Sequence, residues 1–86
     1  MYALDLREKV KEKFHRMEKK NKKQLEIINK KVLKIRENPH IFKPLRYDLK
    51  GFRRVHIDKS FVLVYSIDEK NKTVVLEDYD HHDKIY

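Results

Sequence analysis

The period of the apolar residues changes once along this chain, and that change constrains the fold more than any other feature. Up to about residue 38 the apolar residues recur three or four positions apart, as in an amphipathic helix. From residue 52 onward they alternate with polar residues or run together, as in β-strands. A helical half followed by a strand half predicts an α+β fold, and 86 residues leave room for one domain, residues 1–86.

Two helices are predicted in the first half. A helix from about Leu6 to Lys20 is indicated by four apolar residues at helical spacing, Leu6, Val10, Phe14 and Met17. Asp5 and Glu8 stand three apart, which suits the N-cap of this helix and its reciprocal partner. Residues 2–5 also alternate as a short strand would, so two interpretations compete for Leu6.

The second helix follows a polar break at residues 21–23. Its apolar stripe consists of Leu25, Ile28, Val32 and Ile35. Asn38-Pro39 ends it, because proline disfavours the helical region for the residue before it. The short connection predicts an antiparallel hairpin of the two helices.

Three strands are predicted after Gly51. Val55 and Ile57 point to one face of the first strand, whereas Arg54 and His56 point to the other. Residues 61–67 are apolar on both faces apart from one serine, as in a central strand, and residues 73–76 follow a polar turn. We expect the hairpin to cover one face of a twisted antiparallel sheet of three to four strands. The other face is then the natural place for a site, and residues 80–86 form a short charged tail.

The net charge is +8 with neutral histidines, and its excess lies in residues 1–50, which carry 16 basic and 7 acidic side chains. Such a charge on a small domain indicates an anionic partner, nucleic acid first and an acidic protein second. A solubilising surface is the alternative. The same choice, RNA contact or a solvated face, applies to a run of helix lysines: Lys19, Lys20, Lys22 and Lys23.

Several classes of site are excluded or disfavoured. The absence of cysteine excludes disulfides and thiolate metal sites, and the histidines lack helical metal-ligand spacing, so we expect no metal and no cofactor. His81 and His82 should point to opposite sides of an extended chain. A single glycine excludes a glycine-rich phosphate loop. No apolar run approaches a membrane span and the N-terminus lacks the apolar core of a signal peptide, so we expect a cytoplasmic protein without membrane contact.

The remaining chemistry-bearing residues are cations, imidazoles and phenols. The set comprises Lys43, Arg46, Arg53, Arg54, His56, Tyr79, His81, His82 and Tyr86. These types can cleave RNA without metal, because attack by the 2′-hydroxyl needs a base, cations to stabilise charge on phosphorus and an acid for the 5′ oxygen. The alternative is that basic strands only grip phosphates.

The order of three short motifs resembles the RelE/ParE toxin superfamily, in particular the RelE-like toxins. The motif L-x-G-x-x-R-x-R is matched, with His for the second Arg, by Leu49, Gly51, Arg54 and His56. Y-R-x-x-Y is matched, with Val where Arg is usual, by Phe61, Val62 and Tyr65. H-R-x-x-x-Y is matched, with His where Arg is usual, by His81, His82 and Tyr86. The N-terminal half fits the family as well, with a possible strand followed by two lysine-rich helices that end in Glu-Asn-Pro.

The resemblance implies a type II toxin that cuts mRNA on the ribosome and is bound by an acidic, RelB-like antitoxin. Arg54, Arg46 and Lys43 would hold the scissile phosphate. Tyr86 or His56 would help remove the 2′ proton, and His82 would act as acid or stabilise charge. Arg53 and the four helix lysines would add RNA contacts. Val62 weakens the catalytic interpretation. A protein of the same fold that only binds, either a gyrase-directed ParE-like toxin or an inactive antitoxin-binding member, is the alternative.

Overall fold

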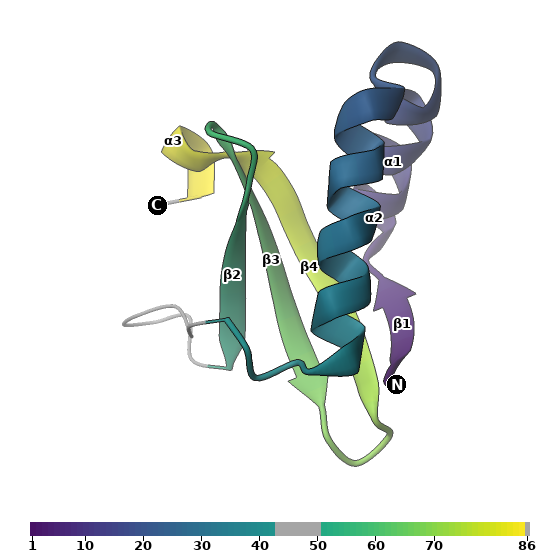
Figure 1. Cartoon of the computed structure of the whole chain (residues 1–86), viewed down its shortest axis with the longest axis vertical. Helices are drawn as coiled ribbons and strands as arrows, with labels where there is room; N and C mark the ends of the chain where they lie inside the picture. The colour runs from purple at the N-terminus through teal and green to yellow at the C-terminus, as the bar shows by residue number, and fades with distance from the viewer. Residues whose placement is uncertain (43–50, 86) are drawn as a thin grey trace.

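The computed structural model describes residues 1–42 and 51–85 (Figure 1). Lys43, Arg46 and Tyr86, three of the predicted site residues, lie outside the described residues. The elements in chain order are β1 (Ala3–Leu6), α1 (Glu8–Lys20), α2 (Lys22–Glu37), β2 (Phe52–Ile57), β3 (Phe61–Asp68), β4 (Thr73–His81) and α3 (His82–Ile85). None of the described helices is long and apolar enough to span a membrane.

One four-stranded sheet carries the order β1-β4-β3-β2. β2, β3 and β4 form the expected antiparallel meander, with the doubly apolar β3 in the centre. The leading strand exists and pairs in parallel with β4, so the sheet is mixed. The α+β fold with a helical hairpin on one face of the sheet is confirmed (Figure 1).

Helix boundaries follow local hydrogen bonding. Leu6 belongs to the strand, and the expected N-cap at Asp5 is wrong: Arg7 caps α1 without a side-chain bond, while the Asp5 carboxylate accepts from the Leu6 N–H. Asn21 caps α2 by accepting from the Gln24 N–H at 3.2 Å. The expected stop at Asn38-Pro39 is confirmed.

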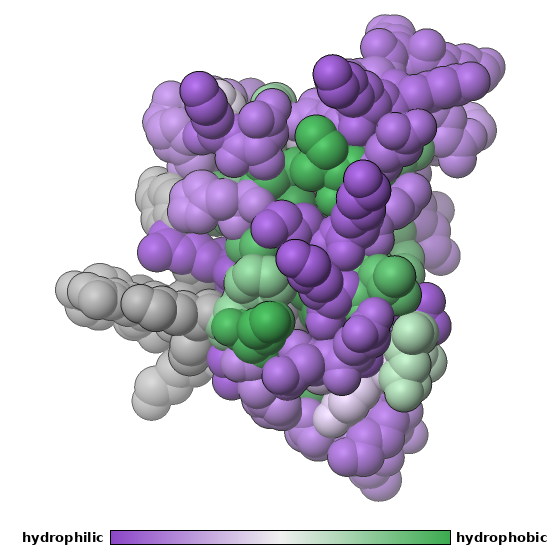
Figure 2. Space-filling model, viewed as in Figure 1, coloured by the Kyte–Doolittle hydropathy of each residue, from purple (hydrophilic) through white to green (hydrophobic). Residues whose placement is uncertain are grey.

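The core lies between the hairpin and one face of the sheet, here called the inner face. From the helices, Val10, Ile28 and Ile35 are fully buried, and Leu63 and Tyr65 meet them from β3. A smaller cluster covers the opposite or outer face, where Val62 and Val64 are packed by Phe52 and Ile85. The rest of the surface seen in Figure 2 is mainly hydrophilic, with apolar atoms in small patches between polar side chains.

The predicted C-terminal tail is wrong in part, because Asp80 and His81 complete β4 and residues 82–85 form a helical turn. β4 also carries an irregularity: Val64 pairs with Asp78 and Tyr65 with Leu76, so Glu77 has no counterpart on β3. Glu77 is only 8% exposed, and it accepts from Arg7 Nε at 2.8 Å and from Ser66 Oγ at 2.6 Å. Burial raises the pKa of Glu77, but the bonds from Arg7 and Ser66 outweigh it and hold that pKa below the ordinary 4.5.

We predict that Glu77→Gln destabilises the fold and flattens its acid sensitivity. A carboxyl with a lowered native pKa adds stability above its unfolded pKa and loses it as the pH falls through the native pKa. The variant should lose about 1–3 kcal/mol of unfolding free energy at neutral pH. It should also show a shallower decline between roughly pH 5 and 3. Urea unfolding across this pH range measures both effects, with Glu12→Gln on the exposed side of α1 as control. Equal pH dependence in wild type and Glu77→Gln would contradict the assignment.

Candidate functional site

Two rows of side chains cross the outer face of the sheet. Arg54 lies opposite Val64, which lies opposite Asp78. His56 lies opposite Val62, which lies opposite Asp80. Adjacent strands are about 4.8 Å apart, so each β2 residue and its β4 counterpart are roughly 10 Å from each other across one valine. Arg54 and His56 thus share a face, as the alternation predicted.

Val62 is not accessible at this face. Its side chain is fully buried, because Ile85 of α3 and Phe52 of β2 pack over the pair Val62 and Val64. A cation at position 62 would have to displace this apolar cluster. The centre of β3 therefore adds no positive charge to the described part of the outer face, whereas β2 contributes Arg54.

Asp78 and Asp80 form the acidic side of the outer face, and both pair with Lys13 of α1. β1 pairs with β4 only as far as Leu76, and α1 runs along the part of the β4 edge that follows. Lys13 Nζ donates to the Tyr79 carbonyl at 2.7 Å and lies 3.3 Å from Asp80 and 3.5 Å from Asp78. Burial raises the pKa of Asp80, but the His81 N–H and the Lys13 ammonium outweigh it and lower that pKa. These contacts cap an open strand edge.

The two histidines at the end of β4 do not point to opposite sides as expected. His81 lies opposite Phe61, with ring centroids 5.6 Å apart, whereas His82 begins α3 and donates its N–H to the Ser60 carbonyl at 2.8 Å. The turn into α3 ends the alternation of the strand and brings the two imidazole rings to 4.6 Å. Ligand atoms of His81, His82 and Asp83 lie within 4.8 Å of one another, so these three could supply ligands to a metal ion.

Arg53 is separated from Arg54 and His56. Its register partner is the buried Tyr65, so it belongs to the inner face of β2. Its guanidinium donates to the Phe42 carbonyl at 2.7 Å and lies 3.4 Å from His40 Nδ1. Adjacent residues of a strand point to opposite faces. Arg53 therefore holds the segment that follows α2, and it lies on the face of β2 opposite to Arg54 and His56.

The lysine-rich end of the hairpin lies at the same end of the molecule as α3 (Figure 1). Lys20 lines one cavity with Phe61 and Asp80, and Lys23 lines another with Ser60 and Phe61. Lys19 and Lys22 line a third hollow on the hairpin itself. The four lysines are distant in sequence from His81 and His82, yet the fold places them towards the same end.

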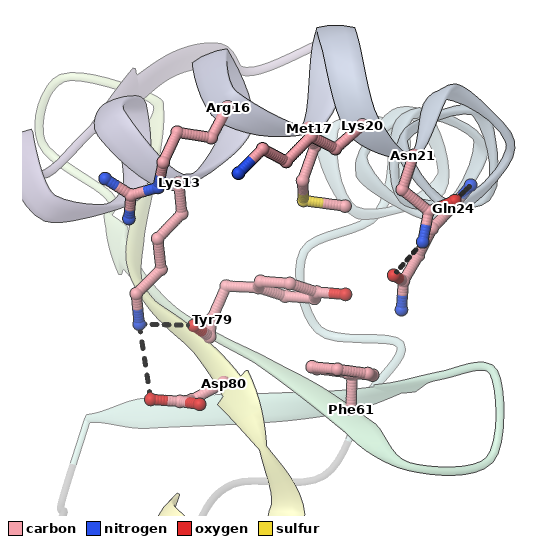
Figure 3. Close-up of a pocket in the computed structure, with 9 residues that line it drawn as sticks. All are labelled: Lys13, Arg16, Met17, Lys20, Asn21, Gln24, Phe61, Tyr79 and Asp80. Carbon is pink, nitrogen blue, oxygen red and sulfur yellow. Dashed lines mark hydrogen bonds and ion pairs between the residues drawn. The ribbon is translucent and has the colours of Figure 1, made fainter.

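Sequence reasoning missed a cavity of about 290 Å³ between α1, the start of α2 and the sheet (Figure 3). It is lined by Lys13, Arg16, Met17, Lys20, Asn21, Gln24, Phe61, Tyr79 and Asp80. Tyr79 is 4% exposed, and its hydroxyl has no hydrogen-bond partner within the described part of the chain. Burial first, and then the charges of Asp58 and Asp80, raise the pKa of Tyr79 to about 12, so the phenol remains a proton donor. No local sequence signal marks a buried hydroxyl that lacks a partner.

Comparison with known proteins gives a family and a fold. The family model of the ParE toxin of the type II toxin–antitoxin system parDE matches residues 4–86. An uncharacterised protein of Methanosarcina mazei is 58% identical over the full length of both chains. A candidate toxin, RelE4, of Methanocaldococcus jannaschii is 49% identical over all of this chain and 92% of its own.

Solved structures of low identity share the fold. A YoeB/ParE toxin from Agrobacterium tumefaciens has a TM-score of 0.86 at 15% identity, with 93% of this chain and 98% of that chain covered. The toxin of the E. coli RelBE toxin–antitoxin complex has a TM-score of 0.80 at 20% identity, with 94% and 96% covered.

We predict that Lys13→Gln raises the pKa of Asp80. The variant removes the ammonium that stabilises the ionised carboxylate, while burial, which opposes ionisation, remains. Carboxyl NMR titration of wild type and variant measures the change, and Lys11→Gln on the exposed side of α1 is the matched control. An unchanged Asp80 titration in Lys13→Gln would mean that the His81 N–H and the charge of Lys84 lower this pKa without Lys13.

Proposed function

The chain belongs to the ParE toxin family of type II toxin–antitoxin systems, within the RelE/ParE superfamily, and we propose that it is a ribosome-dependent mRNA endonuclease that needs no metal ion. The observation that carries the proposal is the shared outer face of Arg54 and His56, at whose end α3 begins with His82. This arrangement supplies a cation and two imidazoles to one end of a sheet.

The proposed reaction is attack of the 2′-hydroxyl oxygen on the adjacent phosphorus. The bond from phosphorus to the 5′ oxygen breaks, leaving a 2′,3′-cyclic phosphate and a 5′-hydroxyl. Arg54, with Arg46 and Lys43, holds the phosphate and stabilises the charge that builds on it. His56 or Tyr86 takes the 2′ proton, and His82 gives a proton to the 5′ oxygen.

An acidic, RelB-like antitoxin is the proposed partner, alongside the ribosome and its mRNA. The charge of +8 favours an acidic binding protein, and the E. coli neighbour of the same fold is a toxin–antitoxin complex.

In vitro translation with added toxin, followed by mapping of mRNA 5′ ends, tests the nuclease proposal. We expect cuts that require the ribosome and that Arg54→Gln greatly reduces. Lys70→Gln, in the turn between β3 and β4, removes the same charge at the opposite end of β4 and should cut normally. Intact mRNA under these conditions would overturn the proposal.

A gyrase-directed toxin without RNase activity is the second candidate. The matching family model is that of ParE, and position 62, in the centre of the outer face, is a buried valine rather than a cation. Loss of gyrase supercoiling activity on addition of this protein, together with intact mRNA in the translation assay, would favour this candidate.

We predict that His82→Arg flattens the pH dependence of cleavage. Histidine changes its charge near neutral pH, whereas arginine stays charged throughout. Cleavage by the wild type should therefore vary more with pH than cleavage by the variant. The readout is the single-turnover rate as a function of pH, with His15→Asn on α1 as control. Parallel profiles for wild type and His82→Arg would exclude proton transfer by His82.

We predict that Tyr86→Phe lowers cleavage by roughly 10²-fold, the low end for a lost acid–base group, and leaves ribosome binding intact. Phenylalanine keeps the ring and removes the hydroxyl. If Tyr86→Phe cuts normally and Tyr86→Ala does not, the residue acts by stacking on a base. Normal cutting by both variants would remove Tyr86 from the site.

We predict that exchanging Lys19, Lys20, Lys22 and Lys23 for glutamine weakens ribosome binding and its salt dependence. Every phosphate that is no longer neutralised should reduce the slope of log affinity against log salt by up to about 0.9 on the duplex scale. Sedimentation with ribosomes at several salt concentrations gives the slope. Unchanged binding at every salt concentration would show that these lysines form only a solvated face.

A further inference from the structure

A groove crosses the end of the molecule between the hairpin tip and the sheet. It consists of the cavity that contains Tyr79 and a neighbouring hollow of about 390 Å³. Both are lined by Asn21, Gln24 and Phe61, so they adjoin beneath the start of α2. We call this the tip groove. In Figure 2 apolar atoms show between the hairpin and the sheet in the upper part of the view, with hydrophilic side chains around them.

The Tyr79 hydroxyl is the group of the tip groove that most needs a hydrogen-bond partner. Its oxygen is buried without a hydrogen-bond partner among the described residues, although a buried hydroxyl normally has one. Figure 3 shows it directed into the space between Met17, Gln24 and Phe61. An occupant that places an acceptor oxygen there would complete its bonding.

The ring of Tyr79 is already covered, which restricts what can bind. Phe61 stacks on it with centroids 5.4 Å apart and planes 10° apart, and Phe14 meets it edge-on at 5.7 Å. An unpaired RNA base would need an open aromatic face for stacking. Met17, Phe61 and Tyr79 contribute apolar atoms to the cavity, and Tyr79 also contributes a hydroxyl. These groups suit an aliphatic side chain beside an acceptor oxygen.

The rim of the tip groove is rich in positive charge. Arg16 and Lys20 line the Tyr79 cavity, and Lys23 lines the neighbouring hollow. The lining holds two acidic residues, Asp80 in the cavity and Asp58 in the hollow. The charge of Asp80 is offset by the Lys13 ammonium at 3.3 Å, so the cations prevail along the groove.

The amides of the lining add hydrogen-bond donors. The Asn21 amide nitrogen donates to Gln24 Oε1 at 3.0 Å. The amide nitrogen of Gln24 carries two N–H groups and can donate to a bound molecule. The tip groove therefore favours an acidic occupant.

We propose that the tip groove binds an extended acidic segment of the antitoxin, with one aliphatic side chain in the cavity and an adjacent acceptor oxygen on the Tyr79 hydroxyl. This inference rests on the antitoxin partner proposed above. The cavity volume of about 290 Å³ lies at the lower end of ligand pockets, which run from roughly 300 Å³, and fits a side chain better than a large cofactor.

Binding between the toxin and the acidic product of the adjoining reading frame tests the proposal. Tyr79→Phe removes only the hydroxyl, and it should raise the Kd about 10-fold, as expected for one hydrogen bond to a charged or strongly polar oxygen. Arg16→Gln should raise the Kd and reduce its salt dependence. Lys70→Gln, in the β3–β4 turn, removes one charge away from the groove and should bind as wild type does.

The melting temperature of the free toxin separates a binding role of Tyr79 from a structural one. Because the hydroxyl lacks a partner among the described residues of the free protein, Tyr79→Phe should melt no lower than wild type. A weaker complex together with an unchanged or higher melting temperature supports the proposal. A weaker complex together with a lower melting temperature would overturn it, as would an unchanged Kd for Tyr79→Phe.

The translation assay distinguishes failure of this inference from failure of the nuclease proposal. Free Tyr79→Phe and Arg16→Gln should cut mRNA as wild type does. If they lose cutting or ribosome binding and keep the antitoxin affinity, the groove binds RNA and the inference is wrong. If the wild-type toxin ignores the adjoining product, the inference is also wrong, whereas the nuclease proposal still stands or falls by mRNA cleavage alone.

Discussion

The parallel pairing of β1 with β4 positions most of the remaining structure. It brings residues 3–6 beside residues 73–76 and places Arg7 within reach of the buried Glu77. Because the pairing ends at Leu76, α1 starts beside the unpaired part of the β4 edge, and Lys13 caps the Tyr79 carbonyl there. The direction of α1 then sets the hairpin tip at the end of the sheet where β4 turns into α3. A short strand thus determines that the lysine-rich tip, the tip groove and the terminal histidines lie together.

Because the domain is small, its apolar side chains cover one face of the sheet more completely than the other. A chain of 86 residues buries roughly 60% of its unfolded surface, and the hairpin supplies apolar cover for the inner face only. On the outer face a few side chains from β2 and α3 cover Val62 and Val64. Among the described residues, the rim around this cluster carries Arg54 and His56 on one side and Asp78 and Asp80 on the other. The α1 lysines neutralise the acidic side, which makes the rim compatible with an anionic substrate.

The change of hydrophobic period predicted the helices, the meander and its central strand, because these depend on which faces are buried. It also separated Arg54 and His56 from Val55 and Ile57. The pattern could not assign Leu6 to the strand or to the helix, because this residue satisfies both periods. It wrongly predicted Asp5 as the N-cap of the first helix, because the strand continues to Leu6 by pairing with β4. The grouping of Arg53 with Arg54 ignored their opposite directions in a strand. The contact of His81 with His82 depends on the turn into α3, and the Tyr79 cavity depends on packing between segments about sixty residues apart, which no local pattern encodes.

The Tyr79 hydroxyl, which has no hydrogen-bond partner among residues 1–42 and 51–85, connects stability to function in this fold. An unsatisfied buried hydroxyl costs about 1–3 kcal/mol, which is a large share of the few kcal/mol that keep a small domain folded. Phenylalanine would fill the same place against Phe61 and Phe14 at lower cost to the free protein. The hydroxyl would be satisfied if another molecule accepted its hydrogen bond. The free toxin would then contain a buried donor without an acceptor, and the complex would not. In that case the antitoxin stabilises the toxin by mass action as well as occupying its surface.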